Sequence, residues 1–252
     1  MCFATSAVLK SKLVKKDFNA TISATDFPNA SIAQDGSVDL NIYHINGFTH
    51  PKIPVITNKQ PDLVQGYHWG LIPNWTKDEE QAQALRNVTL NAKSETLFEK
   101  PSFKDAALTN RCIVLVSGFF EWKTVGKDKV PHYIYCPDTP ILPLAGLYST
   151  WVNPINQEQV NTVTIVTTAA NELMVEIHNT KQRMPVILRN HHVNAWLDSA
   201  TNSAIAQTIA QEIFKPFDAN AMHAYEISKL ISARNQDTNV AEVLTPFKSS
   251  LF

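Results

Sequence analysis

The sequence lacks the features that mark secreted, metal-binding and membrane proteins. Its three cysteines, Cys2, Cys112 and Cys136, form no CxxC pair and no zinc-binding spacing, which predicts a reducing compartment without disulfides. No stretch approaches the ~18 uninterrupted apolar residues of a membrane-spanning helix, and residues 1–20 lack the apolar region of a signal peptide. We therefore expect a cytoplasmic protein with no metal, no cofactor and no membrane partner.

The chain also has almost no net charge. A formal charge of −1 argues against a surface that coats nucleic acid as a whole, so any phosphate contact must come from a local basic patch. The 252 residues contain no fixed-period repeat and no linker rich in proline, glycine or serine. We expect one domain over residues 1–252, and a monomer.

Short segments rich in β-branched and aromatic residues, separated by turn residues, predict a curved antiparallel sheet. These segments are 53–56, 112–116, 118–122, 132–135, 144–148 and 163–167. Helices are expected at 80–86, 170–177, 192–198, 203–214 and 222–230. Strands and helices do not alternate strictly, so the fold class is α+β and not a doubly wound sheet.

Cys2 is the residue with the most distinctive chemistry. Removal of Met1 would leave it with both a thiol and a free α-amine. The amine condenses with an aldehyde to a Schiff base, and the thiolate closes on the imine carbon to give a five-membered thiazolidine ring. The amine titrates near ~8 and the thiol near ~8.5, so both are partly in the reactive form at neutral pH.

Glu121 lies on the predicted strand 118–122 between Phe120 and Trp122. Reduced hydration among such neighbours would raise the pKa of its carboxyl group and suit it to proton transfer. The alternative is a surface glutamate at a strand edge.

His178 follows the predicted helix 170–177 and precedes a polar stretch. A histidine where the chain leaves the core can act as an acid or a base near neutral pH, and the alternative is a capping or surface histidine. Trp69 and Trp75 flank a turn that contains glycine and proline. We interpret Trp69 as a core residue and leave Trp75 open between core and base stacking.

Six sequence blocks, in this order, resemble the SOS-response-associated peptidase (SRAP) family. They are Met1-Cys2, Trp69-Gly-Leu-Ile-Pro-Asn-Trp75, Asn91-Ala-Lys-Ser-Glu95, Arg111-Cys112 with Gly118-Phe-Phe-Glu-Trp122, Thr167-Thr-Ala-Ala170 with Ile177-His178, and Arg183-Met-Pro-Val-Ile-Leu188. The resemblance implies a barrel-like, largely antiparallel β core with peripheral helices. It also implies DNA repair, in which the N-terminal cysteine captures an abasic site in single-stranded DNA as a covalent crosslink.

The resemblance also implies roles for individual residues. Cys2 would supply the amine and the thiol, and Asn91 would form hydrogen bonds near the new ring. Glu121 would position or deprotonate the amine, while His178 would help to open the sugar and move protons. The implied DNA contacts are phosphate binding by Lys93, Thr167 and Arg183, base stacking by Trp75, and an extended basic track at Lys100 and Lys104.

The sequence departs from the family pattern in four places. Phe3-Ala4 stands where Gly-Arg is usual, and His44-Ile-Asn-Gly47 replaces an Asn-x-Ala-Pro segment. Lys93 stands where arginine is typical, and lysine can neutralise a phosphate but cannot fork onto it. Three extra residues separate His178 from Arg183, so the loop between them must differ in shape.

Three other functions remain open from the sequence. One is an N-terminal nucleophile amidohydrolase of the glutamine-amidotransferase type, in which the Cys2 thiolate attacks an amide. Another is a non-catalytic module that binds single-stranded DNA. The third is the thiol peptidase activity that the family's name implies.

Overall fold

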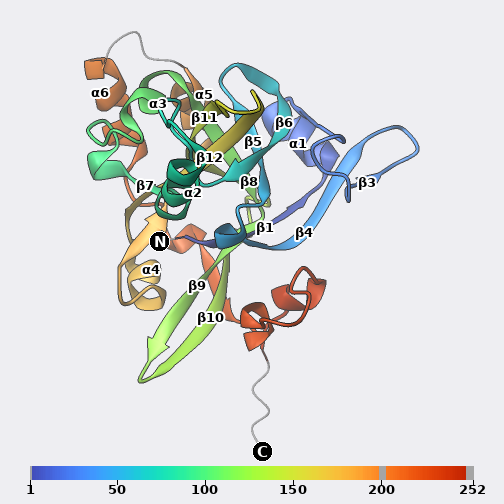
Figure 1. Ribbon diagram of the computed structural model, residues 1–252. Helices are drawn as coiled ribbons and strands as arrows, with labels where there is room; N and C mark the ends of the chain where they lie inside the picture. Colours follow the sequence, from blue (N-terminus) through green and yellow to red (C-terminus); the bar gives the residue numbers. More distant parts are fainter. Residues whose placement is uncertain (1, 199–202, 248–252) are drawn as a thin grey trace, which may run out of the picture.

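The computed structural model describes residues 2–198 and 203–247, with two β-sheets at the centre and helices around them (Figure 1). The strands are β1 (Ala4–Leu9), β2 (Thr21–Ile22), β3 (Ser31–Ile32), β4 (Val38–Asn46), β5 (Lys52–Thr57), β6 (Gln60–Trp69), β7 (Asn91–Lys93), β8 (Arg111–Val116), β9 (Gly118–Val125), β10 (Asp128–Tyr135), β11 (Leu142–Val152), β12 (Gln159–Ala169), β13 (Arg183–Pro185) and β14 (His223–Glu226). The α-helices are α1 (Ser11–Phe18), α2 (Glu79–Val88), α3 (Lys104–Thr109), α4 (Glu172–Ile177), α5 (Asn190–Leu197) and α6 (Ser203–Ile213). Short 3₁₀ helices are η1 (Gly47–Thr49), η2 (Ser94–Thr96), η3 (Ala219–Ala221), η4 (Lys229–Ser232) and η5 (Ala241–Leu244).

The larger sheet closes on itself as a barrel. Strands β12, β11, β8, β5 and β6 pair in this order, and β6 pairs again with β12, in parallel, at His68 and Trp69. The other pairs around the barrel are antiparallel. Every residue of β8 is buried, as expected for an apolar strand covered on both faces. The α+β class and the barrel-like, largely antiparallel core are therefore confirmed.

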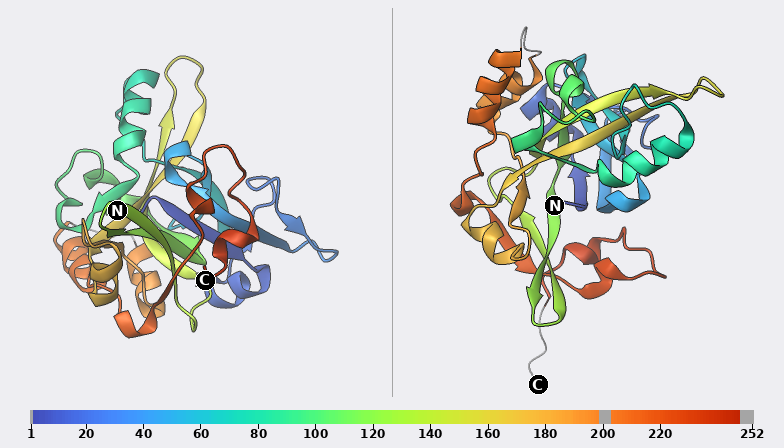
Figure 2. Two further views of the ribbon diagram at one scale, coloured as in Figure 1. Left: turned by 90° about the horizontal axis from the view of Figure 1, so that it is seen from below. Right: turned by 60° about the vertical axis from the view of Figure 1, so that its left-hand side comes forward.

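The second sheet has the order β14-β10-β9-β1-β4-β3 and places β1 between two partners. The β9–β10 hairpin extends away from the barrel, and the segment from β14 to η5 packs beside it (Figure 2). Because β1 begins two residues after Cys2, this sheet fixes where the start of the chain lies.

Four of the five expected helices form, and the expected helix at 222–230 is wrong. That segment contains the strand β14, which pairs with β10, followed by the 3₁₀ helix η4. Tyr225 packs its ring against those of Tyr133 and Tyr135, with centroids 5.7 Å apart in each case. Pairing with a distant strand therefore outweighs the local helical tendency.

Trp69 is fully buried, and its indole N–H donates to the Leu90 carbonyl at 2.8 Å, which confirms its structural role. Gly70 follows with φ +111°, and a Cβ there would lie 2.8 Å from the Arg86 carbonyl oxygen. Only glycine fits this turn, which leads from the barrel toward Trp75. No helix in the described part of the chain is both long and apolar enough to cross a membrane.

Candidate active site at the start of the chain

Cys2 lies two residues before the start of β1 and is fully buried. Its backbone carbonyl accepts a hydrogen bond from Asn91 Nδ2 at 2.9 Å. Burial raises the pKa of the Cys2 thiol far above its usual value, and the nearby Glu121 carboxylate raises it further. With Met1 in place the surroundings of the thiol therefore favour its neutral form, and the expectation of a partly ionised thiol, which concerns the chain without Met1, stays a prediction.

Asn91 begins β7, which pairs in parallel with β12 at the barrel wall. Its side chain is buried, and among the described residues its Oδ1 has no hydrogen-bond partner. A buried amide oxygen without a donor is costly unless something else supplies the donor. Asn91 thus holds the Cys2 backbone with its nitrogen and has an acceptor available on the same amide.

Glu121 lies on β9 and is only 4% exposed. Burial raises the pKa of its carboxyl group to about 8, because the ionised form loses hydration there. The sequence expectation of a poorly hydrated carboxyl with a raised pKa is confirmed, and a surface position at a strand edge is wrong. A group that titrates near 8 can gain or lose a proton close to neutral pH.

His178 caps the C-terminal end of α4 and is buried. Its Nδ1 lies 2.8 Å from the Arg183 carbonyl oxygen, so this nitrogen carries a hydrogen and donates it. Its Nε2 faces Glu121 Oε2 at 3.7 Å, which is an ion-pair distance and too long for a hydrogen bond.

Burial also determines which member of this pair holds a proton. It lowers the pKa of His178, partly opposed by the backbone hydrogen bond to Arg183, while it raises that of Glu121. Both directions favour a neutral carboxylic acid beside a neutral imidazole at pH 7. The Glu121 carboxyl group therefore holds a proton at pH 7. It does so near the Cys2 thiol, because the charge of Glu121 affects the pKa of that thiol.

Three of the predicted phosphate-binding residues lie on neighbouring strands. Lys93 on β7 is aligned with Thr167 on β12, and β13 begins with Arg183, whose Nη2 donates to the Thr167 carbonyl at 2.7 Å. Lys93 is exposed, whereas Thr167 is fully buried behind the Arg183 guanidinium. Their roles in binding DNA stay predictions.

Arg183 is already engaged by a carboxylate that the sequence analysis gave no role. Both terminal nitrogens of its guanidinium contact Glu95, with Nη2 2.9 Å from Oε2. This fork lowers the pKa of the Glu95 carboxyl group. The signal for it was the block 91–95, in which a carboxylate follows an amide and a cation.

The other predicted DNA contacts lie around the connection between β7 and α3, which Trp75 contacts from the loop between β6 and α2. Trp75 is 41% exposed, and its indole N–H donates to the Pro101 carbonyl at 3.3 Å. Lys100 precedes Pro101 and Lys104 begins α3, and both are exposed. Trp75 is therefore neither a core plug nor a free platform, since one edge is tied and part of its surface is open.

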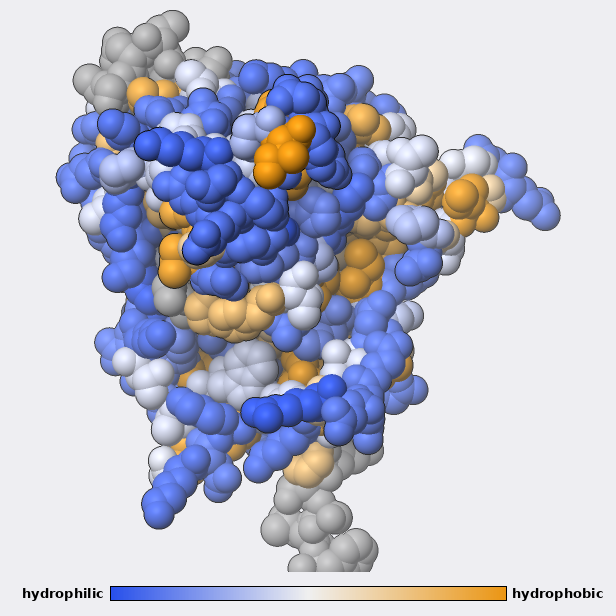
Figure 3. All heavy atoms as spheres, in the orientation of Figure 1, coloured by the Kyte–Doolittle hydropathy of each residue, from blue (hydrophilic) through white to orange (hydrophobic). Residues whose placement is uncertain are grey.

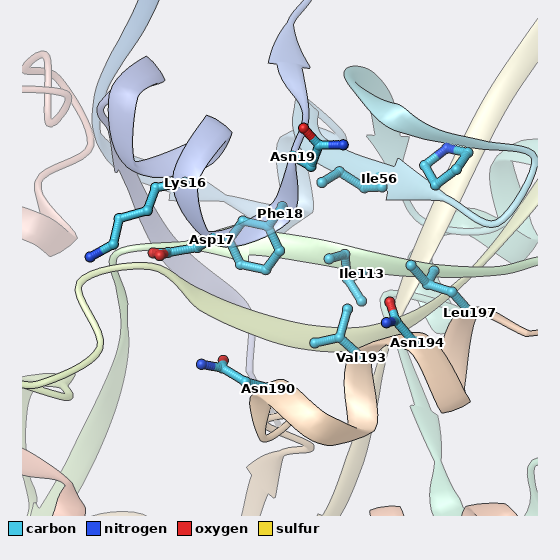
Figure 4. A pocket seen from close by; sticks show the side chains of 11 residues that line it. Lys16, Asp17, Phe18, Asn19, Ile56, Ile113, Asn190, Val193, Asn194 and Leu197 are labelled. Carbon is cyan, nitrogen blue, oxygen red and sulfur yellow. The ribbon is translucent and has the colours of Figure 1, made fainter.

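A separate cavity of about 290 Å³ lies between α1, the barrel wall and α5. Side chains of Phe18, Ile113 and Val193 line it, and none of the predicted site residues does (Figure 4). Among residues 2–198 and 203–247, no group of three or more histidine, cysteine or acidic side chains is placed to hold a metal ion.

Comparisons with known proteins extend over both sheets and all the residues above. The family "SOS response associated peptidase (SRAP)" matches residues 1–234. Abasic site processing protein YoqW of Bacillus subtilis is 38% identical over 192 residues, which are 75% of this chain and 81% of that protein. Abasic site processing protein HMCES of Gallus gallus is 30% identical over 206 residues, 74% of this chain and 58% of that protein. The crystal structure of a Bacteroides thetaiotaomicron protein, 35% identical, has a TM-score of 0.85 and covers 98% of this chain and 100% of its own.

Proposed function

The chain belongs to the SOS response associated peptidase family, and from this premise we propose that it captures abasic sites in single-stranded DNA through Cys2. Relatives named as abasic site processing proteins support a role in abasic-site DNA repair. One observation carries the proposal: Asn91 holds the Cys2 backbone, and the buried Glu121 carboxyl group, whose charge acts on the Cys2 thiol, lies 3.7 Å from His178 Nε2.

The chemistry needs only the chain's own groups and the lesion. An abasic deoxyribose opens to an aldehyde, and the unprotonated α-amine of Cys2 adds to its carbon to form a C–N bond. The resulting carbinolamine loses its hydroxyl group as water and becomes an imine. The thiol then adds across the C=N bond, so that sulfur joins carbon and the thiol proton ends on the ring nitrogen. The product is a thiazolidine, and one water leaves in the whole sequence.

The free amine exists only after Met1 has been removed, because until then the Cys2 nitrogen is part of the peptide bond to Met1. Met1 lies outside the described residues, and its removal is part of the proposal. Removal leaves a titrating amine near the carboxyl group of Glu121, where the two can exchange a proton.

The ionised form of Glu121, a minority at pH 7, accepts the proton from the protonated amine. The neutral carboxylic acid formed in this way then returns a proton to the departing hydroxyl group. A carboxyl group with a pKa of about 8 suits both directions of transfer near neutral pH. Asn91 keeps the Cys2 carbonyl in place, and its free Oδ1 accepts a hydrogen bond from the new ring nitrogen.

The DNA strand lies along the surface near Lys93 and Arg183, with Thr167 orienting Arg183 from behind. Trp75 stacks on a base, and Lys100 and Lys104 continue the cationic track. Such phosphate contacts give binding that weakens with salt and does not depend on base sequence.

Intact-protein mass spectrometry after incubation with an abasic single-stranded oligonucleotide tests the proposal. The expected product has the mass of the protein without Met1 plus that of the oligonucleotide, less one water, and it survives heating. Cys2→Ala should form no adduct, whereas Cys136→Ala, which removes another buried thiol, should form it like the wild type. An unchanged wild-type mass, or an adduct that persists in Cys2→Ala, would overturn the assignment.

The same preparations separate the other candidate functions. An amidohydrolase would release ammonia from glutamine and form no DNA adduct. A simple single-strand binder would bind the oligonucleotide equally well as Cys2→Ala and never change in mass. Thiol peptidase activity stays a prediction, tested by whether Cys2→Ala abolishes cleavage of a peptide substrate.

A further inference from the structure

Phe48 is a large apolar side chain left exposed beside the reactive end of the chain. It lies in η1, and 56% of its surface is open to solvent. Its ring packs on that of Phe3, the residue that follows Cys2, with centroids 4.8 Å apart and planes inclined by 38°. Phe3 in turn packs against the main hydrophobic core. The pair therefore presents one aromatic face outward and is supported from behind.

The backbone around Phe48 is held by several hydrogen bonds. Asn46 caps η1, with its Oδ1 accepting from the Phe48 N–H at 3.0 Å. The Gly47 N–H donates to the Phe3 carbonyl at 2.8 Å and so joins η1 to the start of the chain. A Cβ at Gly47 would lie 3.1 Å from the Trp69 ring and 3.2 Å from the Phe3 carbonyl oxygen. This close approach fixes the ring of Phe48 relative to Cys2.

The space-filling view shows what this face borders. Hydrophobic residues gather around η1 and the start of β1, and directly below them the surface is hollowed (Figure 3). The β9–β10 hairpin and the segment from η4 to η5, residues 229–244, form the opposite wall of the hollow (Figures 1 and 3). The hairpin and the segment are joined by a hydrogen bond from Trp122 Nε1 to Ser232 Oγ at 3.3 Å.

We propose that Phe48, backed by Phe3, stacks on the nucleobase that neighbours the abasic sugar in the strand; this inference rests on the proposed function. An abasic residue has lost its base, so the adjacent base has one face without a stacking partner. An aromatic side chain held near Cys2 can cover that face, whatever the base, because every base has a π-face.

The sequence around Cys2 agrees with this mode of recognition. Phe3-Ala4 occupies the place where the family pattern has Gly-Arg. The arginine that would contact a phosphate is therefore absent, and an aromatic residue, Phe3, stands next to Cys2 instead. Stacking is largely independent of salt, whereas a phosphate contact weakens as salt rises. The aromatic pair therefore provides local affinity for the lesion without added positive charge.

The test measures equilibrium binding with a tetrahydrofuran residue as the lesion, because this analogue has no aldehyde and cannot form a crosslink. Fluorescence anisotropy compares an oligonucleotide with bases on both sides of the tetrahydrofuran with two others, in which either the 5′ or the 3′ neighbour is a second tetrahydrofuran. Phe48→Ala should weaken binding to the first oligonucleotide on the order of tenfold to a hundredfold. Removal of the base that stacks should weaken wild-type binding by a similar factor and leave Phe48→Ala binding nearly unchanged.

Ile155→Ala is the matched control, since it also removes an exposed apolar side chain, at the turn between β11 and β12, and should leave binding as in the wild type. Phe48→Tyr keeps an aromatic face and should retain most of the affinity. The inference is overturned if Phe48→Ala binds as tightly as the wild type, or if it weakens all three oligonucleotides by the same factor. A wild type that shows the Phe48–base coupling yet never crosslinks natural abasic DNA would contradict the proposed function and not the stacking.

Discussion

The side chain of Asn179 bonds to both backbone groups of Thr124. Its Oδ1 accepts from the Thr124 N–H at 3.1 Å, and its Nδ2 donates to the Thr124 carbonyl at 2.9 Å. Asn179 follows His178 directly, and Thr124 lies on β9, the strand that carries Glu121. An ion pair of 2.6 Å between Lys123 and Glu176 joins β9 to α4, the helix that precedes Asn179. The loop between His178 and Arg183, which has three extra residues, is therefore attached to β9, the strand that carries Glu121.

We expect Asn179→Ala to loosen the spacing between His178 and Glu121. The free energy of unfolding should fall by about 1–2 kcal/mol, the usual cost of two lost hydrogen bonds. The rate of crosslinking should fall severalfold, with a shifted pH profile, while the affinity for undamaged single-stranded DNA stays constant. Asn156→Ala, in the exposed β11–β12 turn, is the control for loss of an asparagine. A rate that falls without any change in its pH profile would contradict this positioning role.

Glu121 should make the protein less stable as the pH rises. Its pKa is about 8 in the folded chain against an ordinary value of 4.5, so between these values the folded state binds more protons than the unfolded one. Its contribution is complete below pH 4.5 and is lost as the pH rises through 8, on the order of a few kcal/mol. Urea unfolding midpoints across this range should fall for the wild type and stay flatter for Glu121→Gln. Parallel curves for the two proteins would count against a buried neutral carboxyl group.

His44 should produce the opposite slope at lower pH. Burial lowers its pKa from 6.5 to about 4, so the unfolded chain binds the proton more readily. Stability is therefore present above pH 6.5 and declines as the pH falls through 4. His44 Nδ1 lies 2.8 Å from Thr238 Oγ1, so protonation should first loosen the contact with the segment near Thr238. Hydrogen exchange at pH 4.5 and pH 7 should show this in the wild type, with a smaller pH difference in His44→Gln.

Glu95 should restrain DNA binding, because it neutralises the Arg183 guanidinium in the unbound protein. Glu95→Gln is expected to tighten binding to single-stranded DNA severalfold. If Arg183 then neutralises one further phosphate, a plot of the logarithm of the association constant against the logarithm of the salt concentration should become steeper by roughly 0.7. Glu99→Gln removes an exposed negative charge nearby and controls for the general change in potential. An equal change in both variants would show that the fork itself does not matter.

The sequence predicts the properties of individual site residues better than it predicts which of these residues lie together. The apolar neighbours of Glu121 in the sequence indicated a poorly hydrated carboxyl group with a raised pKa, but they left a surface position open, and the packing of β9 decides for burial. That its carboxylate faces His178 depends on the β9–β10 hairpin and α4 packing together, which no local pattern encodes. The fork between Arg183 and Glu95 is likewise created by the pairing of β13 and β7 with β12.

Elements with weak local signals were missed or misassigned for the same reason. β1 is a run of small and apolar residues whose strand character comes from its partners on both sides. The α-helix α1 was missed because four of the residues in 10–16 are lysines, and these make the apolar pattern around the buried Val14 hard to recognise. The strand β14 was expected to be helical and is held extended by β10.

Because β1 is hydrogen-bonded to β4 on one edge and to β9 on the other, the chain is held on both sides from Ala4, two residues after Cys2. Most polypeptide termini are poorly ordered, and a reactive group at such a terminus would adopt many positions in solvent. Here the ordering of that end is completed during folding, so a substrate need not bring it about. Any treatment that detaches β1 from β4 and β9 should abolish crosslinking by Cys2 before the barrel itself unfolds.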